Sequence, residues 1–131
     1  MSEGFKLEIV NPERSFLNKD DIFEVVVPAF EGDMGILKDH ISIISFLKPG
    51  FVRVFSSGSN EEIYYVEDGI IEFKNNCLSI LTSNIFDIKK IEKNKIKDIL
   101  EKAEKDGQKQ NISDEEKYLI DHKIEALKSL N

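Results

Sequence analysis

The chain has 131 residues, of which 40% are hydrophobic and 33% charged, and its formal net charge is −7. This length leaves room for about one ordinary hydrophobic core plus a smaller satellite. The acidic balance argues against nucleic acid or an anionic membrane surface as the main partner, because such contacts depend on clustered lysine and arginine. A single cysteine, Cys77, excludes an intrachain disulfide and a multi-cysteine metal site, and we expect it to be a small core residue on a strand.

From the sequence we expect neither a membrane span nor a signal peptide. No apolar run approaches the roughly 20 residues of a membrane span. The stretch MSEGFKLEIV lacks the basic and then apolar pattern of a signal peptide. We therefore expect a cytoplasmic location without direct membrane insertion.

Short β-like segments fill the chain up to about residue 86, separated by the turn-forming stretches NPE, EGDMG, KPG, SSGSN, EDG and KNN. This alternation of short strands and turns predicts an antiparallel sandwich or barrel. The run FVRVFS alternates and indicates one mixed face, whereas IFEVVV and SIISFL predict strands that are more fully covered. Pro49 and Gly50 predict the centre of a type II turn, in which the glycine takes a positive φ.

After residue 88 the apolar period becomes helical. Four apolar residues share one face of a predicted helix over residues 91–106, with Gly107 as its stop: Ile96, Ile99, Leu100 and Ala103. Ser113 and Glu116 form a capping box that predicts a second helix, running to about residue 130. Its apolar stripe contains Ile120, Ile124 and Leu127, flanked by Leu119, Ala126 and Leu130. Two such helices predict an antiparallel hairpin that must rest on another part of the protein.

The net charge of the sequence also changes near residue 88. Residues 1–88 hold 7 basic and 15 acidic residues, a net of −8, whereas residues 89–110 hold 8 and 5, a net of +3. Residues 111–131 hold 3 basic and 5 acidic residues, a net of −2. We therefore predict a β domain over residues 1–88 and a two-helix hairpin over residues 89–131.

The sequence offers little catalytic chemistry. His40 and His122 have no HxH, HExxH or CxxC neighbour, so neither indicates a metal site. The stretch EGDMGILKDH at residues 31–40 does not match a phosphate-binding glycine motif, and its three acids would repel phosphate. A general acid–base pair is conceivable from spacing alone, but a solvated turn is the simpler interpretation. These observations favour a protein that acts by binding, without a catalytic residue, metal or cofactor.

A longer pattern covers most of the β region. Residues 25–54, VVVPAFEGDMGILKDHISIISFLKPGFVRV, and residues 64–83, YYVEDGIIEFKNNCLSILTS, resemble the epsilon subunit of F-type ATP synthases, called delta in mitochondria. The resemblance implies a flattened antiparallel β-sandwich of about ten strands followed by two C-terminal helices. It also implies a non-catalytic central-stalk subunit, peripheral on the cytoplasmic face of the bacterial inner membrane. In that family the sandwich packs against the gamma subunit and stands on the c-ring, which keeps rotation and proton flow coupled.

The resemblance assigns roles within residues 31–40, which look like the loop that stands on the c-ring. Glu31 would face the polar c-ring loop, Gly32 and Gly35 would permit a tight backbone, and His40 would lie near the c-ring and gamma contact. The alternative that these glycines only shape turns stays open. The family commonly has Gly-His-Ala-Pro at this histidine, whereas residues 39–42 here are Asp-His-Ile-Ser, which puts the stiffness of the loop in question.

The helical region departs further from the family. Some bacterial members bind ATP through a motif like I-D-x-x-R-A at the start of the first helix. The matching positions here are Ile91, Glu92, Lys95 and Ile96. Glutamate is longer than aspartate, lysine lacks the fork of arginine and isoleucine fills the space of alanine, so we expect no tight ATP binding.

Some members of this family also inhibit ATP hydrolysis. In several bacterial members the hairpin opens and inserts its last helix among the alpha and beta subunits. Acidic residues are mixed with the lysines of residues 111–131, so acidic contacts would partly repel this helix, and inhibition stays open. The alternative functions are a stand-alone β-sandwich module that binds a sugar or peptide, and a small hydrolase using Glu31 or Asp33 with His40.

Overall fold

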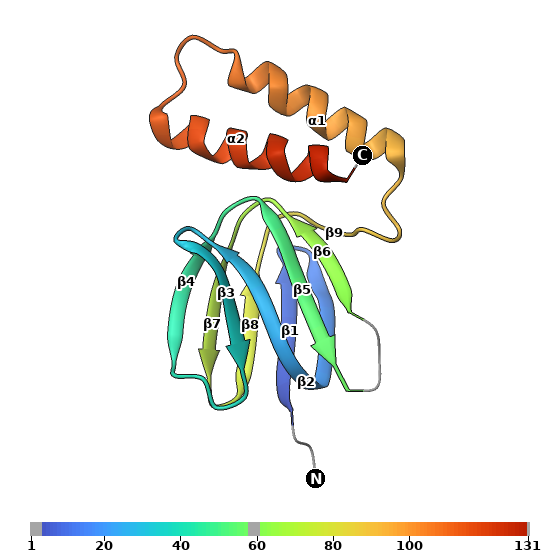
Figure 1. The fold of residues 1–131 in the computed structure, drawn as a ribbon, viewed down its shortest axis with the longest axis vertical. Coiled ribbons are helices and arrows are strands. Elements are labelled where there is room, and N and C mark those ends of the chain that lie inside the picture. The colour runs from blue at the N-terminus through green and yellow to red at the C-terminus, as the bar shows by residue number, and fades with distance from the viewer. Residues whose placement is uncertain (1–3, 58–60, 131) are drawn as a thin grey trace.

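The structure, a computed structural model, describes residues 4–57 and 61–130, so residues 58–60 of the predicted SSGSN turn lie outside the described residues. Figure 1 shows a β-sandwich with a layer of two helices across one end. The described strands are β1 (Phe5–Asn11), β2 (Arg14–Ala29), β3 (Gly32–Leu37), β4 (Ile43–Leu47), β5 (Gly50–Ser56), β6 (Glu62–Val66), β7 (Gly69–Lys74), β8 (Cys77–Leu81) and β9 (Ile85–Asp87). The helices are α1 (Lys93–Gly107) and α2 (Asp114–Ser129).

The long strand β2 joins the two layers of the sandwich. Its first part pairs with β1, and its second part, from Ile22 onward, pairs with β3 and β5. The change of partner falls at Asp21, whose φ of 58° lies in the left-handed region and redirects the strand. One layer therefore contains β4, β7, β8, β1 and the start of β2, and the other contains β3, the rest of β2, β5, β6 and β9.

The predicted class, a mainly β sandwich followed by a helical hairpin, is confirmed. The resemblance implied about ten strands, and counting the two parts of β2 separately gives that number from the nine described strands. The sheet is mixed rather than wholly antiparallel, because β1 and β8 run parallel with Leu7 opposite Leu78.

The main hydrophobic core lies between the two layers. Successive side chains of a strand point to opposite faces, so each strand sends every second residue inward. Leu7 on β1, Val25 on β2 and Ile71 on β7 are fully buried in this way. Each such side chain stabilises the fold by roughly 1.5–3 kcal/mol through its removal from water.

A second hydrophobic cluster holds the hairpin on the end of the sandwich. Its buried members are Tyr65 on β6, Ile96 on α1, and Ala126 and Leu127 on α2. The half-buried Phe51 packs against them from β5. The hairpin therefore lies folded on the sandwich in this structure, and its apolar stripes face both each other and the β5–β6–β9 region (Figure 1).

The helix ends agree closely with expectation. The amide of Glu116 donates a hydrogen bond to Oγ of Ser113 at 3.0 Å, which confirms the predicted cap of α2. The first helix was predicted over residues 91–106 with Gly107 as its stop; α1 runs from Lys93 and includes Gly107 as its last residue, which has no positive φ. A Cβ at this position would come 3.2 Å from Cγ2 of Ile120, so Gly107 lets the two helices approach closely.

Two local predictions are wrong. Gly50 is not among the described glycines with positive φ; it begins β5, and a Cβ there would come 2.8 Å from Cβ of Pro28. Close approach of two strands, rather than a type II turn, therefore requires this glycine. Cys77 does begin a strand, but it is half-buried on the outer face of β8, because Leu78 takes the inward position.

Candidate interaction surfaces

The segment predicted as one loop, residues 31–40, is a strand with a turn at each end. Its middle forms β3, which pairs with β2 along its whole length. A strand rises about 3.3 Å per residue, so the two turns lie roughly 20 Å apart. The structure therefore does not bring Glu31 and His40 together. In Figure 1, β3 runs from the end of the sandwich that bears the helices to the opposite end.

Glu31 lies in the turn next to the helices and is exposed. Ala29 pairs with Gly32, so only Phe30 and Glu31 form the connection between β2 and β3. Gly32 has a φ of 135°, which residues with a side chain rarely adopt. The hydroxyl of Tyr118 on α2 donates a hydrogen bond to the carbonyl of Phe30 at 3.3 Å, which places Glu31 beside the helix layer.

Gly35 lies within β3, opposite Val26 of β2. A Cβ at this position would come 3.0 Å from Oε2 of Glu24. This glycine therefore makes room for a neighbouring carboxylate and does not shape a turn.

His40 lies at the opposite end of β3, half-buried against the main core. Its backbone amide donates to the carbonyl of Leu37 at 3.1 Å, and its ring meets the ring of Phe73 edge-on at 5.9 Å between centroids. The preceding residue, Asp39, has a φ of 65° and exchanges two hydrogen bonds with Asn76, at 2.7 and 2.8 Å. These bonds tie the turn that carries His40 to the turn between β7 and β8.

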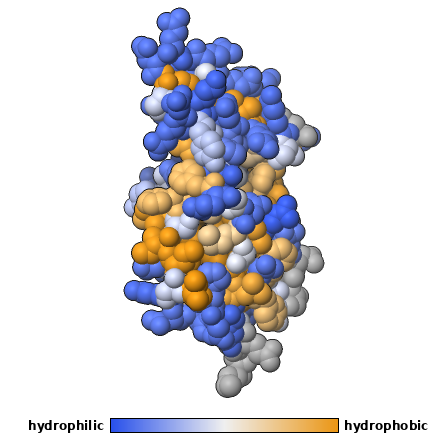
Figure 2. All heavy atoms as spheres, turned by 60° about the vertical axis from the view of Figure 1, so that its left-hand side comes forward, coloured by the Kyte–Doolittle hydropathy of each residue, from blue (hydrophilic) through white to orange (hydrophobic). Residues whose placement is uncertain are grey.

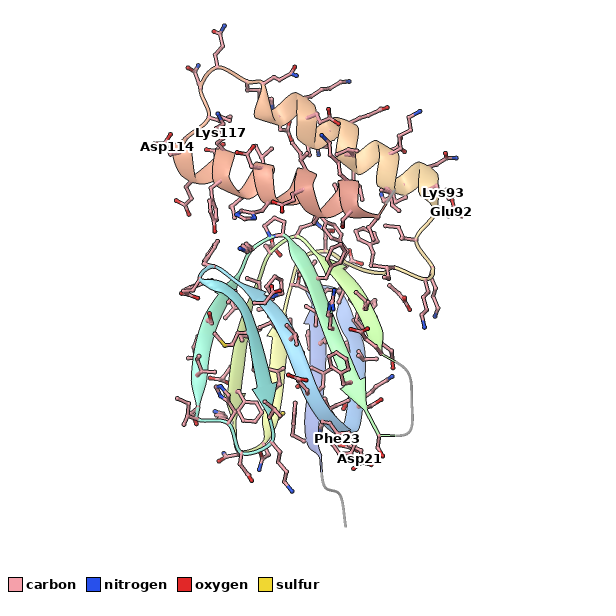
Figure 3. The ribbon with its side chains drawn as sticks, in the orientation of Figure 1. Asp21, Phe23, Glu92, Lys93, Asp114 and Lys117 are labelled. Carbon is pink, nitrogen blue, oxygen red and sulfur yellow. The ribbon has the colours of Figure 1, made fainter. Side chains whose placement is uncertain are left out.

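The two weak nucleotide-motif positions lie at the start of α1, near the labelled residues at the right of Figure 3. Glu92 is exposed and makes no side-chain cap, whereas Nζ of Lys95 lies 5.9 Å above the ring of Phe86. A cavity of about 540 Å³ opens nearby and is lined by Phe86 and Ile91. Neither Glu92 nor Lys95 lines it, so the structure does not gather the motif around a cavity.

The same cavity borders a small polar network. Lys19 on β2 forms an ion pair with Glu62 on β6, and the hydroxyl of Tyr64 donates to Oε2 of Glu62 at 2.6 Å. The hydrogen bonds from Lys19 and Tyr64 lower the pKa of the Glu62 carboxyl, while burial and then this hydrogen bond raise the pKa of Tyr64. A carboxylate held ionised in this way is a poor general base. The ion pair and the hydrogen bond instead stabilise the packing of β2 against β6.

The contact between the hairpin and the sandwich contains one stabilising ion pair and one destabilising buried hydroxyl. Nζ of Lys123 on α2 forms an ion pair with Glu67, and the two side chains are only 27% and 14% exposed. The hydroxyl of Tyr65 is buried without a hydrogen-bond partner among the described residues, and burial raises the pKa of Tyr65 above its usual range. Leaving that hydroxyl unpaired costs about 1–3 kcal/mol, so the docked hairpin is not maximally stable.

An apolar surface lies on the outside of the sandwich, where the sequence predicted a covered strand. The run SIISFL supplies β4, in which Ile44 and Phe46 are 66% and 56% exposed. The register continues this surface across three neighbouring strands as one line of side chains, which we call the outer apolar row: Phe46 on β4, Ile70 on β7, Leu81 on β8 and Val10 on β1. Figure 2 shows apolar atoms gathered on this side of the sandwich, below the largely hydrophilic helices.

The sequence did contain a signal for the outer apolar row. Consecutive isoleucines at residues 43–44 and 70–71 supply an apolar residue to both faces of a strand. Such pairs predict burial on both faces only if another layer covers the outside. Here no described layer covers the outside of β4, β7 and β8 (Figure 1).

Two further kinds of feature are absent from the described ranges 4–57 and 61–130. No three His, Cys, Asp or Glu residues gather there in a way that could hold a metal ion. Neither of the two described helices is long and apolar enough to cross a membrane.

The fold and its surfaces define a class of protein: a β-sandwich with a docked helical hairpin and an exposed apolar sheet face of the kind that binds other proteins. The family model described as ATP synthase, Delta/Epsilon chain, beta-sandwich domain matches residues 4–88. The chain therefore belongs to the ATP synthase delta/epsilon chain family, as the resemblance indicated.

Curated relatives agree with this assignment. The ATP synthase epsilon chain of Pelagibacter ubique is 66% identical over the full length of both chains. The epsilon chain of Dichelobacter nodosus is 37% identical over 80% of this chain and 73% of the relative. The mitochondrial ATP synthase subunit delta of Schizosaccharomyces pombe is 31% identical over 87% of this chain and 67% of the relative.

Solved structures share the fold at low sequence identity. A chain of the Euglena gracilis mitochondrial ATP synthase matches with a TM-score of 0.76 and 19% identity, covering 99% of this chain and 81% of that one. A chain of the Tetrahymena thermophila mitochondrial ATP synthase, in its central stalk and c-ring, matches with a TM-score of 0.70 and 14% identity. The Tetrahymena match covers 98% of this chain and 96% of that one, so the likeness includes the hairpin.

Proposed function

We propose that the chain is a non-catalytic rotor subunit in the central stalk of a proton-translocating ATP synthase. It would couple the gamma subunit to the c-ring while lying peripherally at the cytoplasmic face of a bacterial inner membrane. The outer apolar row carries this proposal, because a stable face of exposed Phe46, Ile70 and Leu81 needs a protein partner to cover it. The 66% identity to an epsilon chain supports the same role.

The proposed site residues of β3 lie at two separate places on the sandwich. Glu31 is exposed in a turn that Gly32 makes possible, and we assign this end to the polar loops of the c-ring. Gly35 supports the assignment indirectly, since it lets β3 pair closely with β2 beside Glu24. His40, about 20 Å away along the strand, is assigned a separate contact near the c-ring and gamma, apart from the outer apolar row.

The first test is purification of the tagged chain from gently solubilised native membranes. A rotor subunit brings the alpha, beta, gamma and c subunits with it, in the proportions of a stalk. If the chain elutes alone, it is instead a free β-sandwich module, and ligand screening becomes the next experiment.

Matched variants locate the gamma contact. Phe46→Asp places a charge in the outer apolar row and is expected to lose gamma. Phe23→Asp makes the same change at a side chain that is 43% exposed, at the far end of the sandwich (Figure 3), and is expected to keep gamma. Loss of gamma from both variants, or from neither, would refute this placement.

The hairpin is proposed to regulate hydrolysis by leaving the sandwich and reaching the alpha and beta subunits. The unpaired hydroxyl of Tyr65 supports release, because opening returns it to water. Hydrolysis is compared between assembled enzyme with the full chain and enzyme whose chain lacks residues 90–131. Faster hydrolysis after deletion supports inhibition, and an unchanged rate refutes it.

Because Glu92 and Lys95 do not line the nearby cavity, the proposal includes no nucleotide site.

A further inference from the structure

The cavity of about 540 Å³ beside β9 has a wall that combines aromatic rings with one acid and one base. The first part of β2 contributes Phe16, β6 contributes Tyr64, and β9 contributes Phe86 and Asp87. Lys90 completes this set from the turn that leads to α1. Among the described residues that line the cavity, none belongs to the outer apolar row. A cavity of this volume suits a small molecule.

The three rings give the cavity an affinity for positive charge. The rings of Phe16 and Tyr64 meet edge-on, with centroids 5.7 Å apart and an interplanar angle of 88°. Phe86 adds a third ring, and both phenylalanines are half-buried. The face of an aromatic ring attracts a cation, and the attraction is stronger where water is partly excluded. Rings from three different strands therefore favour a ligand with an alkylated ammonium group.

Asp87 supplies a negative charge at the same place. It lies opposite Tyr64 in the pairing of β9 with β6, and side chains of such a pair are neighbours on one face. Oδ1 of Asp87 accepts a hydrogen bond from the amide of Lys89 at 2.9 Å, which holds the carboxylate in position. A fixed carboxylate beside aromatic rings strengthens the preference for a cationic group.

Lys90 supplies the opposite charge. Its amide donates to the carbonyl of Asp87 at 3.0 Å, so the acid and the base belong to one turn. A second ammonium group is close, because Nζ of Lys95 lies 5.9 Å above the ring of Phe86. These lysines would repel a ligand that carries only positive charge, and they attract a carboxylate. A ligand with both charges therefore matches the wall better than a simple cation or a simple anion.

We propose that this cavity binds a betaine-type zwitterion, a small molecule with a quaternary ammonium group and a carboxylate. The ammonium group lies against the three aromatic rings beside Asp87, and the carboxylate faces Lys90. This inference is independent of the proposed rotor function, since both the site and its test need only this chain.

Three ligands of similar size test the two charges separately. Glycine betaine carries both charges, choline lacks the carboxylate, and 3,3-dimethylbutanoate has carbon in place of the quaternary nitrogen. Each is titrated into the full chain at low salt, and nuclear magnetic resonance follows the amides of Phe86, Asp87 and Lys90. Glycine betaine is expected to bind with a dissociation constant on the order of 1 mM, and each analogue about fivefold more weakly. If glycine betaine does not bind, or if either analogue binds as tightly, the proposal is overturned.

Matched variants locate the two charges in the full chain. Asp87→Asn keeps an oxygen for the amide of Lys89 and is expected to weaken glycine betaine about 3- to 10-fold. Asp98→Asn, at an exposed acid of α1 away from the cavity wall, is expected to change nothing. Lys90→Gln is expected to weaken glycine betaine about threefold without weakening choline, and Lys93→Gln to weaken neither ligand.

The variants contradict the proposal if either member of a pair matches its control. Equal affinity of Asp87→Asn and Asp98→Asn for glycine betaine would mean that the carboxylate at the cavity is not used. Equal affinity of Lys90→Gln and Lys93→Gln would mean the same for the ammonium group. Spectra without ligand show whether each variant is folded, and the comparison of the three ligands on the wild-type chain decides if one is not.

Discussion

Gly32 has the strictest backbone requirement in the turn proposed to meet the c-ring. Its φ of 135° is a conformation that side chains disfavour. Gly32→Ala is therefore expected to lower the free energy of unfolding by about 1–3 kcal/mol, measured by urea denaturation. Gly35→Ala is the matched control, because its new Cβ meets only the flexible end of the Glu24 side chain. A loss as large in the control would show that the backbone of Gly32 is not the cause.

Tyr64 and Tyr65 are adjacent tyrosines with opposite hydrogen-bonding states. Tyr65→Phe removes a buried, unpaired hydroxyl and is expected to stabilise the protein by about 1 kcal/mol. Tyr64→Phe removes the hydrogen bond to Glu62 and is expected to destabilise it by about 0.5–1.5 kcal/mol. Urea titrations of both variants measure the difference, and a shift of the same sign in both would contradict the assigned bonding of the two hydroxyls.

At the scale of elements, α2 is attached to the sandwich by one partly buried ion pair beside an apolar cluster. Lys123→Ala leaves Glu67 without its cation, and removing one partner of such a pair costs roughly 1–3 kcal/mol. Hydrogen exchange is expected to become faster along α2 in this variant. Lys117→Ala, at an exposed lysine of the same helix, is the control and should leave exchange unchanged. Equal protection in the two variants would mean that the ion pair does not hold the helix.

The elements differ in how well their sequences predicted them. The cap at Ser113 and the stripe through Leu127 were predicted correctly, because both depend on residues within a few positions of each other. The outer face of β4 was predicted wrongly, because its exposure depends on whether another layer covers Ile44 and Phe46. Nothing within the five residues of β4 carries that information.

At the scale of the whole molecule, two separate hydrophobic clusters predict two cooperative units. The main cluster lies within the sandwich, and the second joins the hairpin to it through Tyr65. We expect the amide of Leu127 in α2 to exchange through a local opening, at a free energy a few kcal/mol below global unfolding. The amide of Ile71 in β7 is expected to need global unfolding. Identical exchange free energies for both would show that the protein opens as a single unit.

The sequence by itself determined the elements and the family. Turn residues, the helical period after residue 88, the cap at Ser113 and the long pattern across residues 25–83 were sufficient, because each is carried by side chains in chain order. These local signals yielded the β-sandwich, the hairpin and the relation to ATP synthase epsilon chains.

Only the tertiary structure decided which surfaces exist. It separated Glu31 from His40 by forming β3 between them, and it explained Gly50 by its contact with Pro28. It also placed α2 beside the outer apolar row, which created a groove between them. These features depend on strand register and on contacts between residues far apart in the chain, and local propensity does not specify which distant residues meet.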